Sequence, residues 1–102
     1  MINVIFAQGD GMIVMDVDGH AGFAKLGEDI VCAAASMLSQ AIVFALEGVS
    51  DIALHSEIAD GHLSVGCTET PETEAMMRVA RAGFDHLRQA FPDYVSVQNC
   101  KV

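Results

Sequence analysis

An uncharged segment, residues 30–46, constrains the fold more than any other part of the sequence. Apolar residues fall on nearly every side of it when it is drawn as a helix. Only three polar residues interrupt it: Ser36, Ser39 and Gln40. Asp29 is a typical N-cap and Gly48 a typical C-terminal stop, so the pattern predicts a helix over about 30–47. A helix without a charged face is buried on more than one side. The segment is slightly short for a membrane span, so we expect it to be buried within protein.

Short β-type segments lie on both sides of this helix. The predicted strands cover residues 2–7, 12–18, 51–57, 62–67 and 94–97. Glycine-containing turns at residues 8–11 and 59–61 close two hairpins. With a second helix over 71–90, the order is ββαββαβ. We therefore predict a single α+β domain over residues 1–102, with a mixed, mostly antiparallel sheet packed with two helices.

The second predicted helix is ordinary and amphipathic. Thr70 is a candidate N-cap, Pro71 suits the first helical position, and Glu72 and Glu74 suit the positive end of the helix dipole. The predicted apolar stripe consists of Met76, Val79, Ala80, Phe84, Leu87 and Phe91. This helix needs only one partner surface, in contrast to the first.

The composition indicates a globular chain with more apolar residues than the core of one small domain can bury. Apolar residues make up 52% of the sequence, and the mean hydropathy of +0.39 is high for so short a chain. This excess predicts a second buried face, such as a dimer interface. The net charge of −9 repels nucleic-acid phosphates, so we expect no nucleic-acid partner, whereas a basic protein substrate would be attracted.

The three cysteines, Cys32, Cys67 and Cys100, are odd in number and dispersed, so they predict no disulfide framework. No CxxC pair indicates a zinc site. The amino-terminal residues 1–10 lack the basic and apolar regions of a signal peptide. We therefore expect a reducing, cytoplasmic location.

Cys32 lies three residues into the first predicted helix, a position that favours a reactive thiolate. Unpaired first-turn amides and the helix dipole stabilise a thiolate there, and the same amides could hold an oxyanion. Glu28 and Asp29 oppose this effect with their negative charges. His20, at the end of the second predicted strand, is the best candidate base, because the strand end and the helix start can meet at one edge of the domain.

Each of these residues also has a purely structural interpretation. A cysteine near a helix start is more often a small buried hydrophobe. A histidine beside Gly19 is more often a turn residue, and Asp29 is more often only an N-cap. On spacing alone these alternatives stay open.

The stretch 19–36 is more specific than its separate residues. It contains Gly-His-Ala at 19–21, then Gly27, Asp-Ile-Val-Cys-Ala-Ala at 29–34, and Ser36. This pattern resembles the signature of the ribosomal-processing cysteine protease family, often called Prp, which runs GHA, a small spacer, then G-x-DIVCAA-x-S. The order of hairpins, helices and last strand is also similar, so the resemblance extends over essentially the whole chain.

The resemblance implies a cysteine endopeptidase without a cofactor or metal. Such a protein would remove the N-terminal extension of a large-subunit ribosomal protein by cleavage next to an aromatic residue. The family's nucleophile corresponds to Cys32, its histidine to His20 and its aspartate to Asp29, whose role as helix cap, histidine orienter or both stays open. The segment from Gly22 to Gly27 corresponds to a substrate loop. The resemblance also implies a homodimer, which fits the apolar first helix.

From this resemblance we expect the loop of residues 21–28 to be disordered or closed over the site without substrate. Two other classes stay open: a non-catalytic ribosome-associated peptide-binding dimer, and a structural dimer in which Cys32 is buried and inert. We expect Cys67 and Cys100 to be structural. The remaining histidines receive no role: His55, His62 and His86.

Overall fold

The computed structural model describes residues 1–25 and 27–101 and contains five strands and two helices. The elements follow one another as β1 (Ile2–Gly9), β2 (Met12–Asp18), α1 (Ile30–Glu47), β3 (Leu54–Ala59), β4 (His62–Thr68), α2 (Pro71–Ala90) and β5 (Val95–Lys101). The predicted order ββαββαβ is confirmed. Both predicted caps are present as well, because Asp29 caps α1 and Thr70 caps α2.

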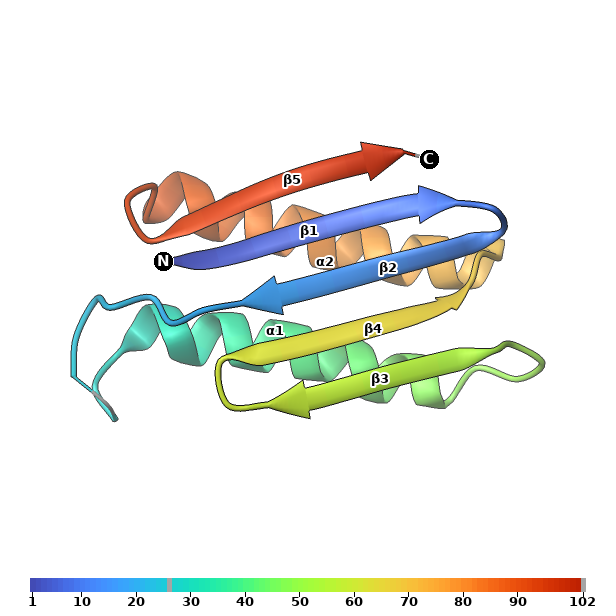
Figure 1. Cartoon of the computed structure of the whole chain (residues 1–102), viewed down its shortest axis with the longest axis horizontal. Helices are drawn as coiled ribbons and strands as arrows, with labels where there is room; N and C mark the ends of the chain where they lie inside the picture. Colours follow the sequence, from blue (N-terminus) through green and yellow to red (C-terminus); the bar gives the residue numbers. More distant parts are fainter. Residues whose placement is uncertain (26, 102) are drawn as a thin grey trace.

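The strands form one mixed sheet in the order β3-β4-β2-β1-β5. All neighbours pair antiparallel except β5, which runs parallel to β1. Both helices cover the same face of the sheet, with α1 behind β2 and β4 and α2 behind β1 and β5 (Figure 1). The molecule therefore has two layers and one open sheet face.

The core lies between these two layers. Alternate strand residues point inward, as the two-residue period of a strand requires. The fully buried set from the sheet includes Val4, Ile13, Met15, Val65, Cys67 and Val95. From α2, Phe84 packs against Phe6 with ring centroids 6.3 Å apart.

The outer face of α1 is apolar and exposed. Ile30 is 59% exposed, Met37 72% and Phe44 60%, at a spacing of seven residues. By length and hydropathy alone α1 could cross a membrane, with a mean hydropathy of 1.8 and a third of its residues buried. The sheet and α2 bury two sides of α1, and the face with Ile30, Met37 and Phe44 stays exposed in the single chain.

The structure differs from the prediction at the ends of several strands and on one face of α2. The third strand begins at Leu54 and not at residue 51, because Asp51 has a positive φ of 63° that no strand tolerates. The last strand continues to Lys101 because β1 supplies pairing partners along its length. On α2, Val79 is 62% exposed, whereas Met77 is fully buried.

The buried face of α2 lies to one side of the predicted apolar stripe because a polar residue belongs to the buried face. Thr73 is fully buried, and its hydroxyl donates to the Thr68 carbonyl oxygen at 2.7 Å while also taking part in the N-terminal capping box with Thr70. A search for apolar residues alone does not find this position. The buried stripe is Thr73, Met77, Ala80 and Phe84.

Candidate active site

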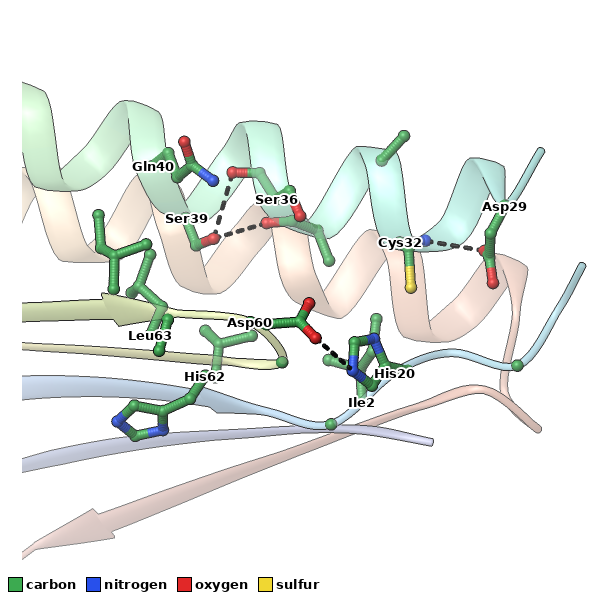
Figure 2. A pocket seen from close by; sticks show the side chains of 18 of the residues that line it. Ile2, His20, Asp29, Cys32, Ser36, Ser39, Gln40, Asp60, His62 and Leu63 are labelled. Carbon is green, nitrogen blue, oxygen red and sulfur yellow. Dashed lines mark hydrogen bonds and ion pairs between the residues drawn. The ribbon is translucent and has the colours of Figure 1, made fainter. Parts of the chain in front are cut away.

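A cavity of about 600 Å³ opens at the end of the sheet where β2 leaves it. Its walls come from the first half of α1, the loop after β2 and the β3–β4 turn (Figure 2). Cys32, His20 and Asp29 all line it, as do Gly22 and Gly27. The structure therefore brings all the sequence-predicted site residues to one cavity.

Cys32 is half-buried on the first turn of α1. In Figure 2 its sulfur points away from the helix toward the layer that contains His20. The Ala21 amide donates a hydrogen bond to Cys32 Sγ at 3.2 Å. The sulfur therefore already faces a backbone hydrogen-bond donor from the loop. Neither Cys67 nor Cys100 lines this cavity, and burial raises the pKa of the Cys67 thiol.

His20 follows the end of β2, and its backbone is fixed on two sides. The Met1 amino group donates to the His20 carbonyl oxygen at 2.7 Å, and the Gly19 amide donates to the Gly61 carbonyl oxygen at 2.8 Å. The imidazole is exposed, at 63%, and has its Nε2 4.0 Å from Asp60 Oδ2. Within the described residues, no hydrogen bond joins this imidazole to Cys32.

Asp29 is occupied by backbone amides. Its Oδ1 accepts from the Cys32 amide at 2.9 Å, and its Oδ2 accepts from the Phe23 and Ala24 amides at 3.0 and 3.4 Å. The hydrogen bond from Cys32 is the main cause of a lowered Asp29 pKa, with partial burial acting in the opposite direction. These contacts make Asp29 a helix cap and an anchor of the loop, and none of them reaches His20.

This capping changes the expected oxyanion site. The Cys32 amide is bonded to the Asp29 carboxylate and the Ala33 amide to the Asp29 carbonyl oxygen, so neither is free to bind an oxyanion. The expectation of unpaired first-turn amides next to the thiol is wrong for these two groups. The amide that faces the sulfur comes instead from Ala21 in the loop.

The loop between β2 and α1 projects beyond the end of the sheet (Figure 1). Gly22 and Gly27 have positive φ values of 69° and 88°, which glycine adopts without strain. The Phe23 ring lies edge-on to Phe91 and Tyr94, with centroids 5.4 and 5.2 Å away. The loop is therefore held at two points, by the Asp29 carboxylate and by the aromatic rings around Phe23. Leu26, which belongs to the predicted substrate loop, lies outside the described residues.

Sequence reasoning missed two groups at this site. Asp60 and Gly61 were recognised only as a turn, yet they lie against His20 because Asp18 of β2 pairs with His62 of β4. His62, also on the cavity wall, is hydrogen-bonded to Asp18, which raises the His62 pKa. In residues 1–25 and 27–101, no group of three or more His, Cys, Asp or Glu residues is placed to hold a metal ion.

Solved structures share this fold. A crystal structure of an essential ribosomal processing protease Prp from S. aureus, with a covalently linked product peptide, has 23% identity and a TM-score of 0.86 over 97% of this chain and 99% of that one. The same protease with a substrate peptide matches at 21% identity and a TM-score of 0.77, with the same coverage. The SMU.848 protein of Streptococcus mutans matches at 28% identity and a TM-score of 0.74 over 100% of this chain and 96% of that one.

The comparison with curated protein sequences gives no significant match. Residues 1–96, in contrast, match the family described as cysteine protease Prp. That match covers every element that lines the cavity, from β1 through β4. The chain belongs to the cysteine protease Prp family.

Proposed function

We propose that this protein is a cysteine endopeptidase that removes the N-terminal extension of a large-subunit ribosomal protein, cleaving next to an aromatic residue. One observation carries the proposal: in a chain of the cysteine protease Prp family, Cys32 and His20 reach a single cavity from α1 and from the end of β2. The S. aureus protein of the same fold is described as a ribosomal processing protease and is seen with substrate and product peptides. These descriptions support a peptide substrate of ribosomal origin.

In the proposed reaction the His20 imidazole takes the proton of the Cys32 thiol. The thiolate then attacks the scissile carbonyl carbon, so that a C–S bond forms. The C–N bond breaks, and the leaving amine takes the proton from the imidazolium. Water hydrolyses the resulting thioester, which releases the carboxylic acid product and restores the thiol.

The Ala21 amide acts on the charge that develops during this reaction. It already donates to Cys32 Sγ and therefore lies next to the carbon that the sulfur attacks. Because Ala21 directly follows His20, the base and this amide are positioned by the same stretch of backbone. We assign the Ala21 amide to stabilisation of the thiolate and of the oxyanion that follows it.

The loop of residues 21–28 acts as a gate in this proposal. Its glycines allow large backbone changes, whereas Asp29 and the two aromatic rings around Phe23 favour one arrangement. Substrate entry moves the loop while Asp29 continues to cap α1. Gating would limit stray proteolysis by a free thiol in the cytoplasm, where we place the protein.

The acidic chain suits a basic substrate. A net charge of −9 attracts a basic ribosomal tail, and added salt weakens that attraction. The protein acts as a homodimer in this proposal, with the exposed apolar face of α1 as the contact surface. Such a dimer covers the apolar face of α1 that the sheet and α2 leave exposed.

The test is mass spectrometry of the extended ribosomal protein after incubation with wild type, Cys32→Ala and His20→Ala. We expect one cut next to an aromatic residue with wild type and none with either variant. Cys100→Ala, on the exposed end of β5, is the matched thiol control and should cut normally. Tight binding without cleavage, unchanged in Cys32→Ala, would instead support the non-catalytic peptide-binding dimer.

A further inference from the structure

We propose that the β3–β4 turn positions the base: Gly61 sets where the His20 imidazole lies, and Asp60 places a carboxylate beside its Nε2. This inference rests on the proposed protease function and assigns two positioning residues outside the stretch 19–36. Neither residue touches the thiol. Both act through His20.

Gly61 forms a surface that only a glycine can provide. A Cβ added there would lie 2.7 Å from His20 Nε2, a distance that real Cβ atoms essentially never show, and 3.3 Å from both Cδ2 and Cε1, so the ring would have to move. The imidazole therefore rests directly on the Gly61 backbone. The hydrogen bond from the Gly19 amide to the Gly61 carbonyl oxygen ties the turn to the residue before His20. The β3–β4 turn therefore contacts the imidazole ring of His20 and also fixes the backbone next to His20.

Asp60 supplies the charge beside the ring. Its Oδ2 is 4.0 Å from His20 Nε2, so the carboxylate faces one ring nitrogen and leaves Nδ1 for exchange with the thiol (Figure 2). A third group that orients the base is a common feature of thiol and serine hydrolases. In this protein Asp60 is the third group, which orients His20. Its side chain is 98% exposed, so solvent weakens the attraction without abolishing it.

The other charged groups on the cavity walls already have partners. Asp29, at the start of α1, accepts backbone amides, and His62, on β4, is bonded to Asp18 of β2. The remaining titratable groups that line the cavity are Cys32 on α1, His20 and Asp60 itself. Asp60 is therefore the carboxylate among the described lining residues that can respond to the charge of His20.

The first test measures how fast iodoacetamide alkylates Cys32 at neutral pH in Asp60→Asn. At low salt we expect a rate about threefold lower than in wild type, since two unit charges 4 Å apart attract each other only weakly in water. Asp60→Glu should restore most of the rate, and 1 M salt should remove the difference. Asp10→Asn is the matched control, because Asp10 also precedes a glycine in a hairpin turn but lies at the other end of the sheet.

The second test measures how fast iodoacetamide alkylates Cys32 at neutral pH in Gly61→Ala. The added methyl group must displace the imidazole, so we expect at least a tenfold slower reaction. Gly11→Ala is the matched control: Gly11 has a similar φ of 76°, against 69° for Gly61, but nothing lies within 4 Å of its added Cβ. Both variants carry the same backbone strain, and only one meets the base.

An unchanged alkylation rate in Asp60→Asn, or an equally slowed reaction in Asp10→Asn, overturns the role of Asp60. Equal alkylation rates in Gly61→Ala and Gly11→Ala overturn the role of Gly61. If Gly61→Ala does not fold, the Asp60 series decides the proposal. Neither measurement uses a peptide substrate, so failure of this inference is distinguishable from failure of the proposed protease function.

Discussion

Asp29 combines two roles at the scale of a single residue, because one carboxylate caps α1 and holds the loop through the Phe23 and Ala24 amides. We predict that Asp29→Ala lowers the melting temperature by about 5 °C at neutral pH, through loss of the cap. The pKa of Asp29 is lowered in the folded state. Its contribution is therefore present above the ordinary value of 3.8 and is lost as the pH falls through the folded pKa.

Melting curves of wild type and Asp29→Ala between pH 2.5 and 7 check this prediction. The two curves should converge in acid. Glu28→Ala, which removes the neighbouring carboxylate, is the control and should change the melting temperature little, because the Lys25–Glu28 pair is exposed. A constant difference between wild type and Asp29→Ala at all pH values would contradict the prediction.

His62 gives a second prediction at this scale. The hydrogen bond to Asp18, with smaller contributions from Glu57 and Asp16, raises the His62 pKa above 6.5. The pair should therefore stabilise the fold fully below pH 6.5 and lose that effect as the pH rises through the folded pKa. An NMR titration of Asp18→Asn should move the His62 midpoint back toward 6.5. If His62 titrates identically in both proteins, the Asp18 contact is absent in solution.

Site residues that belong to a local sequence motif can be predicted from the sequence. Site residues that are brought in by pairing between distant strands cannot. Cys32, His20 and Asp29 stand in one motif, so all three could be predicted from the order of residues along the chain. Asp60 and Gly61 have only the appearance of a turn. Their place beside His20 follows from the register between β2 and β4, which pairs Asp18 with His62. Such a long-range register is not encoded in local composition.

The loop is the element on which the proposed gating depends, and Phe23 is its aromatic anchor. Phe23→Ala removes two edge-to-face contacts, with Phe91 and Tyr94. We predict a loss of about 1.5 kcal/mol in unfolding free energy and faster amide hydrogen exchange confined to the loop. Phe23→Tyr retains the ring and should behave as wild type. Loop exchange in Phe23→Ala at the wild-type rate would show that the aromatic contacts do not restrain the loop.

Element boundaries were predicted well where capping residues define them and poorly where pairing does. Asp29 and Thr70 place both helix starts correctly. β3, in contrast, is limited by its partner, since Leu54 pairs with Cys67 and Ala59 with His62. The buried face of α2 was misjudged at Val79 because the polar Thr73 belongs to it. Local patterns therefore predict which elements exist, and tertiary contacts decide where they end and which way they face.

At the scale of the whole molecule, two hairpins and two helices were predictable, but their assembly was not. The sheet order β3-β4-β2-β1-β5 places the second hairpin beside β2 and the last strand beside β1. Each placement joins segments far apart in the sequence, and nothing local distinguishes it from the opposite arrangement. The consequence is functional, because this order sets the β3–β4 turn next to the end of β2 and so completes the cavity.

The apolar face of α1 leads to the last prediction, on the oligomeric state. Ile30, Met37 and Phe44 form a row of exposed side chains on a helix that has no charged residue before Glu47. A row of this kind is typical of an interface between two copies of a chain. Sedimentation of the wild type should therefore give the mass of two chains of 10.8 kDa each. Met37→Glu should give the mass of one chain, because two glutamates would face each other across the interface.

Met12→Glu is the matched control for this experiment. Met12 is also exposed, at 38%, but it begins β2 and lies away from α1. It should leave the dimer intact, so that loss of association in Met37→Glu alone locates the interface on α1. A wild type that sediments as one chain, or a Met37→Glu variant that remains paired, would contradict the prediction. If the wild type instead binds lipid vesicles and Met37→Glu does not, the apolar face of α1 contacts a membrane surface and not a second chain.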